Sequence, residues 1–134
     1  MPEPHPYILL IDDDGDDLEM FSSELEKKGI RVKTFDSSTN ALFYLKLMFD
    51  IQQLPSLIIM DYNMPKRNGY QVLQLIKDNK DTKNIPVVMY STSMSAILKT
   101  QLGDAGALHC FNKPWTTKEL NSQVQIFHEL VSSP

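Results

Sequence analysis

The chain has 134 residues, of which 42% are apolar and 22% charged, values typical of one globular domain with a substantial core. Its formal net charge of −4 argues against a nucleic-acid-binding surface, which is normally basic. A single cysteine, Cys110, excludes an internal disulfide, and no apolar run approaches the ~20 residues of a membrane span. We see no signal peptide ahead of Tyr7, and we therefore expect a cytoplasmic protein that engages neither nucleic acid nor a membrane.

Short apolar runs alternate with segments of helical periodicity along the whole chain. The predicted strands are the short apolar runs, in chain order residues 7–11, 31–35, 57–60, 87–90 and 108–111. The predicted helices are the segments whose apolar residues recur three or four positions apart, at about 18–28, 38–48, 70–79, 96–102 and 117–130. This alternation predicts one α/β domain with a parallel sheet and helices on both faces.

Several local signals place the ends of the predicted helices. Gly29 follows a basic last turn and is expected to stop the first helix. Ser37 or Ser38 can cap the second helix. Glycines near the end of the fourth helix are expected to stop it, and Thr116 with Glu119 forms a capping-box pattern that starts the fifth.

In an open parallel sheet, the binding crevice lies outside the carboxyl ends of the strands. The polar residues at those ends are therefore the functional candidates: Asp12, Asp13 and Asp14 after the first strand, Asp61, Tyr62 and Asn63 after the third, Ser91, Thr92 and Ser93 after the fourth, and Asn112 and Lys113 after the fifth. Acids, hydroxyls and one lysine are thus expected to share a single edge.

The stretch IDDDGDD places five carboxylates within six positions, at the point where the first strand ends. Like charges about 4 Å apart repel by ~1 kcal/mol in water and by ~4 kcal/mol in a partly screened site. Asp14 is the expected cap of the first helix, and Asp16 and Asp17 fit its positive N-terminal end. Asp12 and Asp13 belong to the strand end, where Asp61 would join them. A hard divalent cation such as Mg²⁺ would offset that repulsion.

Other metal and phosphate sites do not fit these residues. With Gly15 at the sixth position of a calcium loop, the first and twelfth positions would be Leu10 and Phe21, which cannot ligate calcium. No glycine-rich run ends in Gly-Lys-Ser/Thr, so a P-loop is excluded. The three histidines show no zinc spacing.

The segments ILLIDDD, LIIMDYNMPKRNG, PVVMYSTS and FNKPW, in this order and spacing, resemble a response-regulator receiver domain. The combination is specific, because it joins an acid pair, a single acid, a hydroxyl and a Lys-Pro pair at four successive strand ends. The resemblance covers nearly the whole chain and implies a single receiver domain over residues 1–134, with a core over about 6–131. It implies a doubly wound, flavodoxin-like (βα)5 fold with strand order 2-1-3-4-5.

The resemblance also implies roles for individual residues. Asp61 would be the nucleophile that takes a phosphoryl group as an aspartyl phosphate. Asp13, Asp61 and the backbone carbonyl of Asn63 would ligate Mg²⁺ directly, while Asp12 would act through water. Lys113 would pair with Asp61 and later with a phosphoryl oxygen.

The switch residues implied by the resemblance are Ser91 and Cys110. Ser91 would hydrogen-bond the phosphoryl group, with the backbone N–H of Thr92 contributing. Receivers commonly carry an aromatic residue three positions before the lysine, where this chain has Cys110. The neighbouring Phe111 should point to the opposite face of the sheet, because side chains alternate along a strand. We therefore expect Cys110 to report a conformational change rather than to drive it.

The function that the resemblance implies is phosphoacceptance in a two-component phosphorelay. The donor would be a histidine kinase or a histidine phosphotransfer protein. The output would be a changed surface that acts through a downstream protein or through self-association, or else the phosphoryl group would pass on to another histidine. Such a protein is not an enzyme, although self-phosphorylation and slow self-dephosphorylation are expected. Two alternatives are an aspartate-nucleophile phosphatase that uses Asp12 and Asp14, and a receiver-like scaffold that acts without phosphorylation.

Overall fold

The computed structural model describes residues 6–114 and 116–132, so residues 1–5, 115 and 133–134 of the predicted domain lie outside the described part. Strands and helices alternate as the sequence predicts. The strands are β1 (Tyr7–Ile11), β2 (Arg31–Phe35), β3 (Leu57–Asp61), β4 (Val87–Ser91) and β5 (His109–Asn112). The helices are α1 (Gly15–Lys27), α2 (Ser38–Asp50), α3 (Gly69–Asp78), α4 (Ala96–Asp104) and α5 (Thr117–Ser132).

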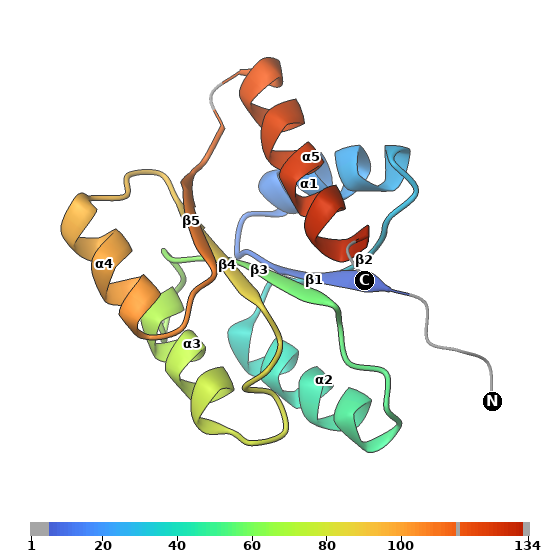
Figure 1. Ribbon diagram of the computed structural model, residues 1–134, viewed down its shortest axis with the longest axis vertical. Helices are drawn as coiled ribbons and strands as arrows, with labels where there is room; N and C mark the ends of the chain where they lie inside the picture. Colours follow the sequence, from blue (N-terminus) through green and yellow to red (C-terminus); the bar gives the residue numbers. More distant parts are fainter. Residues whose placement is uncertain (1–5, 115, 133–134) are drawn as a thin grey trace.

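The five strands form one sheet in the order β2-β1-β3-β4-β5, and every neighbouring pair is parallel. This confirms the predicted fold and strand order. Helices α1 and α5 cover one face of the sheet, and α2, α3 and α4 cover the other (Figure 1). Because all strands run the same way, their carboxyl ends meet at one edge, which is where the candidate residues lie.

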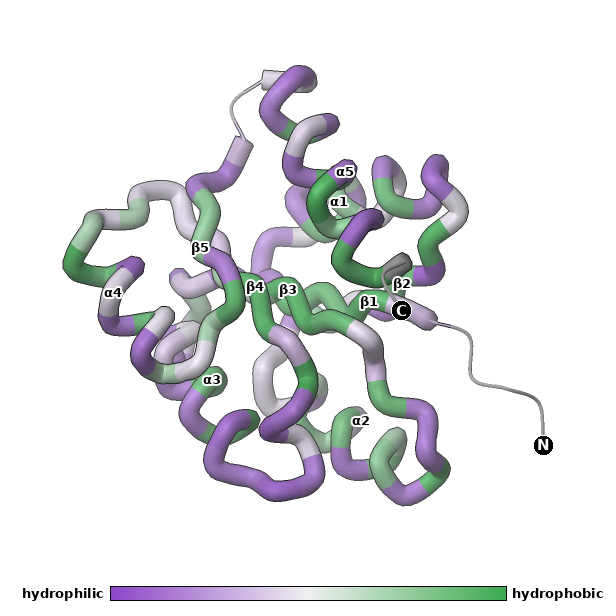
Figure 2. Tube along the Cα trace, viewed as in Figure 1, coloured by the Kyte–Doolittle hydropathy of each residue, from purple (hydrophilic) through white to green (hydrophobic). Residues whose placement is uncertain are grey.

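Two apolar cores fill the spaces between the sheet and its helix layers. One core lies under α1 and α5 and includes Phe21 and Phe127, and the other lies under α2, α3 and α4 and includes Leu45 and Leu102. The central strands β3 and β4 are buried along their whole length, as near-continuous apolar runs predict. Figure 2 shows these strands as the apolar centre of a largely polar outer layer. None of the helices in the described ranges is long and apolar enough to span a membrane.

Three helix starts follow the sequence signals. The Asp14 side chain accepts hydrogen bonds from the first turn of α1, and Ser37, rather than Ser38, caps α2. The Thr116 hydroxyl accepts a bond of 3.1 Å from the backbone N–H of Glu119. Each cap satisfies N–H groups that have no partner within the helix.

Several other boundaries differ from the prediction by one to three residues. Helix α3 begins at Gly69, one residue early, because Asn68 and Gln71 form a reciprocal capping box. Helix α4 continues through Gly103 to Asp104, and the chain turns only at Gly106, whose φ of +112° suits glycine. Strand β5 starts one residue later than expected, at His109.

Candidate functional site

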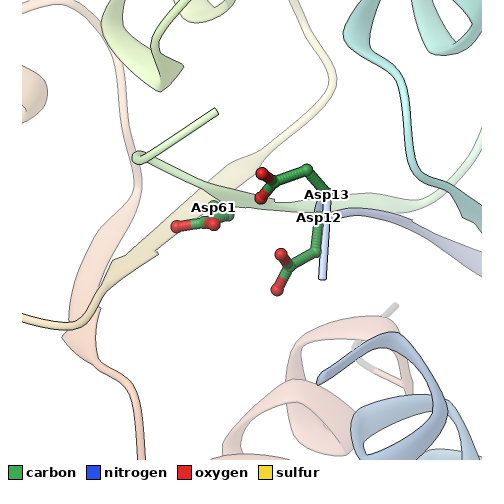
Figure 3. Close-up of side chains that lie close together, drawn as sticks. All are labelled: Asp12, Asp13 and Asp61. Atoms are coloured by element: carbon green, nitrogen blue, oxygen red, sulfur yellow. The ribbon is translucent and has the colours of Figure 1, made fainter. Parts of the chain in front are cut away.

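The carboxyl ends of β1 and β3 bring Asp12, Asp13 and Asp61 together. Ile11 pairs with Met60 in the sheet, so Asp12 and Asp61 come next along two adjacent strands. Oxygen atoms from the three carboxylates lie within 4.8 Å of one another (Figure 3). Asp12 and Asp61 are buried, whereas Asp13 is exposed. The acidic cluster, as we call these three residues, is therefore embedded in the sheet on one side and reaches solvent through Asp13.

Both carboxylate oxygens of Asp12 accept hydrogen bonds from the protein. Oδ1 accepts from the backbone N–H of Asp14 at 2.9 Å, and Oδ2 accepts from the hydroxyl of Tyr90. Burial raises the pKa of Asp12, although these hydrogen bonds favour its charged form. Burial and the charge of Asp12 also raise the pKa of Tyr90 far above its ordinary value. The Tyr90 hydroxyl therefore keeps its proton and acts as a donor.

Asp61 lies at the end of β3, with only 1% of its surface exposed. One carboxylate oxygen accepts a hydrogen bond of 3.0 Å from the backbone N–H of Asn63, and the other lies 3.5 Å from Nζ of Lys113. Burial, reinforced by the charge of Asp12, raises the pKa of Asp61 to about 7. The carboxylate is thus poorly solvated, and cations placed beside it will interact with it strongly.

Lys113 contacts three carboxylates at once. Its Nζ lies 2.8 Å from Asp17, 3.5 Å from Asp61 and 3.8 Å from Asp12. It also lies 5.4 Å from the centre of the Tyr90 ring. Burial alone would lower the pKa of Lys113, but the hydrogen bond to Asp17 and the nearby acids raise it. The ammonium group is therefore firmly charged and stabilises the site against the repulsion of its acids.

Ser91 and Asn63 connect the ends of β4 and β3. The side-chain amide of Asn63 donates a hydrogen bond of 2.8 Å to the Ser91 hydroxyl. The Ser91 side chain is buried, and its backbone carbonyl accepts a bond of 2.8 Å from the N–H of Lys113. Thr92 follows directly and is exposed. Tyr90 pairs with Asp61 in the sheet, so Ser91, one of the two predicted switch residues, comes next on the neighbouring strand.

Cys110 and Phe111 lie on opposite faces of β5, as period-two alternation predicts. Cys110 packs against the core under α2, α3 and α4, whereas Phe111 packs against the core under α1 and α5. Cys110 pairs with Met89 in the sheet, two residues before Ser91 on β4. Burial raises the pKa of the Cys110 thiol, which keeps it in the less reactive protonated form.

Gly69 holds the start of α3 close to the acidic cluster. Its backbone N–H donates a bond of 2.8 Å to the carbonyl of Tyr62. A Cβ at this position would lie 2.6 Å from Sδ of Met89 and 2.8 Å from Cα of Tyr62. Only glycine therefore fits between the β3–α3 loop and the core beneath it.

Two residues of the site were not predicted in these roles. Asp17 was expected only as an acid at the start of α1, yet it makes the shortest contact with Lys113. Tyr90 was expected only as part of a buried strand, yet its hydroxyl holds Asp12. A signal for Tyr90 was present, because a buried tyrosine hydroxyl usually has a hydrogen-bond partner. The prediction for Asn63 concerns only its backbone carbonyl, and the side-chain bond to Ser91 adds a second role.

Comparisons with known proteins agree on one family. The family model described as the response regulator receiver domain matches residues 8–125. The two-component response regulator ORR3 of rice is 34% identical over 114 residues, which cover 85% of this chain and 84% of that protein. The chain therefore belongs to the response regulator receiver family.

Solved structures show the same fold over nearly the full length. The phosphorylated cyanobacterial phytochrome response regulator RcpA superposes with a TM-score of 0.84 at 28% identity, covering 96% of this chain and 95% of that one. The Mn²⁺-bound form of response regulator Rcp1 gives a TM-score of 0.79 at 26% identity, with 97% of each chain covered. Receivers are signalling modules of two-component systems: histidine kinases give them phosphoryl groups, and they signal to downstream partners.

Proposed function

We propose that this chain accepts a phosphoryl group on Asp61 from a phosphohistidine, which a histidine kinase or a histidine phosphotransfer protein supplies. The observation that carries the proposal is the environment of Asp61. It is a buried carboxylate beside two further acids, and the ammonium of Lys113 lies 3.5 Å from it. Such an arrangement suits a nucleophile whose product carries additional negative charge.

The donor set of the acidic cluster fits Mg²⁺. Three carboxylates with oxygen atoms within 4.8 Å of one another supply the hard ligands that this cation prefers. We propose Asp13, Asp61 and the Asn63 carbonyl as direct ligands, and Asp12 as a residue that acts through water. When bound, Mg²⁺ would offset the repulsion among the acids and stabilise the negative charge of the phosphoryl oxygens.

In the proposed transfer, an oxygen of Asp61 attacks the phosphorus of the phosphohistidine. The new bond joins this oxygen to phosphorus while the phosphorus–nitrogen bond breaks, and its electron pair stays with the imidazole of the donor. Lys113 supplies positive charge to the transferred oxygens. The Ser91 hydroxyl, with the N–H of Thr92, binds a phosphoryl oxygen once the group is in place. For Ser91 this requires the hydroxyl to turn away from the backbone carbonyl of Ser93, to which it now donates a bond of 3.3 Å.

The phosphatase alternative is less favoured by the geometry. It needs Asp14 as a second catalytic acid, but the Asp14 carboxylate accepts hydrogen bonds from the backbone of Asp16 and Asp17 as the cap of α1. A scaffold that never takes phosphate remains the competing hypothesis, and the labelling experiment below separates the two.

The test is intact mass after incubation with acetyl phosphate and Mg²⁺. We expect the wild-type mass to rise by one phosphoryl group, and the added group to be lost on treatment with hydroxylamine, as an acyl phosphate requires. Asp61→Asn should stay unlabelled, whereas Asp16→Asn, with the same charge change, should label like wild type. Labelling of Asp61→Asn, or none in the wild type with any phosphodonor, would reject the proposal.

A further inference from the structure

The closest acid to Lys113 is on α1 and not in the acidic cluster. Nζ of Lys113 lies 2.8 Å from Oδ2 of Asp17, a full charge-assisted hydrogen bond, and 3.5 Å from Oδ2 of Asp61, which is at the limit of one. Both partners of the shorter contact are largely screened from solvent, with 20% of the Lys113 side chain and 24% of the Asp17 side chain exposed. The resting ammonium is therefore held on the α1 side of the site.

We infer that Asp17 is a positioning residue that competes with Asp61, and with a phosphoryl group on Asp61, for the ammonium of Lys113. This inference rests on the function proposed above. One ammonium has three protons, and a short bond to Asp17 fixes the direction of one of them. Moving the Lys113 ammonium into contact with a phosphoryl oxygen requires lengthening or breaking the bond to Asp17. Asp17 thus opposes occupancy of the phosphoryl position.

The charges around Lys113 indicate that Asp17 and a phosphoryl group on Asp61 would compete for its ammonium. Asp17 is a third negative charge around the same cation, in addition to Asp12 and Asp61. A carboxylate that becomes an acyl phosphate gains negative charge, which raises the demand on Lys113. Without Asp17, the Lys113 ammonium could approach a phosphoryl oxygen without first breaking a hydrogen bond to α1.

The position of Asp17 in its helix does not by itself explain this contact. Acids in the first turn of a helix are favoured by the helix dipole, and Asp16 shares that benefit. The cap of α1 is Asp14, whose side chain accepts from the backbone N–H groups of both Asp16 and Asp17. Asp16 therefore offers a matched control: it has the same charge, it lies in the same first turn of α1, and it forms no ion pair with Lys113.

The experiment measures the affinity of beryllofluoride, a stable phosphoryl mimic, for the full chain at saturating Mg²⁺. We expect Asp17→Asn to bind the mimic roughly threefold to tenfold more tightly than wild type. Asp16→Asn should change the affinity by less than about twofold, which measures the general effect of one lost negative charge. In a Lys113→Gln background, the gain from Asp17→Asn should fall to that of Asp16→Asn.

A second readout does not depend on the mimic. In a crystal structure of Asp17→Asn without phosphoryl mimic, Nζ of Lys113 should move closer to Asp61 than the present 3.5 Å. Equal gains for the two variants, weaker binding in Asp17→Asn, or a gain that persists without Lys113 would each overturn the inference while leaving the phosphoacceptor role of Asp61 intact. Absence of both mimic binding and mass labelling in wild type would overturn both.

Discussion

The hydroxyl of Tyr90 donates a hydrogen bond to the carboxylate of Asp12 in the buried part of the sheet edge. Both residues point to the α1 and α5 side of the sheet, where the Tyr90 ring lies 5.2 Å from that of Phe21. The bond joins the end of β1 to β4 across the intervening strand β3. It therefore fixes one member of the acidic cluster independently of any metal.

Removing this hydroxyl in Tyr90→Phe should lower the free energy of unfolding by about 1–3 kcal/mol at neutral pH, because a buried carboxylate oxygen loses its donor. Urea denaturation without divalent cation measures the change. Tyr70→Phe is the control, since its hydroxyl only accepts a bond from Gln74 on the helix surface. If both variants lost the same free energy of unfolding, the bond from Tyr90 to Asp12 would stabilise the fold no more than a surface hydroxyl does.

Mg²⁺ binding should depend on Asp13 far more than on Asp16. Asp13 belongs to the acidic cluster, whereas Asp16 lies in the first turn of α1. We expect Asp13→Asn to weaken Mg²⁺ binding on the order of tenfold, since it would remove one of the proposed charged ligands. Asp16→Asn should alter it only by the screened effect of a distant charge. Isothermal titration calorimetry compares them, and similar losses would place the metal elsewhere.

The stability of the metal-free protein should depend on pH through Asp61. Burial raises its pKa to about 7 in the folded state, above the ordinary aspartate value, so the folded chain binds this proton more tightly than the unfolded chain. The stabilisation from this proton is fully present below about pH 4 and is lost as the pH rises through 7. Between pH 5 and 8, wild type should therefore lose free energy of unfolding relative to Asp61→Asn. If the free energy of unfolding varied with pH in the same way for both proteins, the raised pKa of Asp61 would be contradicted.

The same proton should compete with the metal. Because a carboxylate must be deprotonated to ligate Mg²⁺, the apparent affinity should fall as the pH drops below 7, approaching tenfold per pH unit. Titrations at pH 8, 7 and 6 test this expectation. Equal affinities at pH 6 and pH 8 would show that Asp61 is already charged across that range.

Gly69→Ala should destabilise the protein by about 1–3 kcal/mol, because its Cβ would overlap Met89 and the backbone of Tyr62. Gly103→Ala is the matched control, since nothing lies within 4 Å of its Cβ in α4. In the last turn of α4, a glycine to alanine change should instead gain up to about 0.5–1 kcal/mol, the value for a helix interior. Thermal unfolding of both variants gives the comparison. A Gly69→Ala variant as stable as wild type would show that the β3–α3 loop can shift to make room for the added Cβ.

The sequence predicted the parts of the site that depend on local pattern. Apolar runs locate the ends of β1 and β3, and the acids that follow them must then meet at one edge of a parallel sheet. Cys110 and Phe111 were correctly assigned to opposite faces, because alternation along a strand is a local rule.

Contacts between distant elements could not be obtained in this way. Asp17 and Lys113 are 96 positions apart, and their contact depends on how α1 is rotated against the sheet. The hydrogen bond from Tyr90 to Asp12 spans 78 positions and needs the side chains of two non-adjacent strands to lean toward each other. The start of α3 is different, because its capping pair, Asn68 and Gln71, lies three positions apart and is a local signal in the sequence.

The pairing of Ile11 with Met60 has a consequence for how the sheet assembles. A shift of β3 by one residue against β1 would turn Asp61 to the opposite face, away from Asp12. A misaligned sheet would then lack a divalent-cation site, so the ion would bind only chains whose strands are correctly aligned. By mass action the ion would favour the native strand alignment over its slipped alternatives. The same ion would then stabilise the correctly folded sheet in addition to its proposed part in phosphoryl transfer.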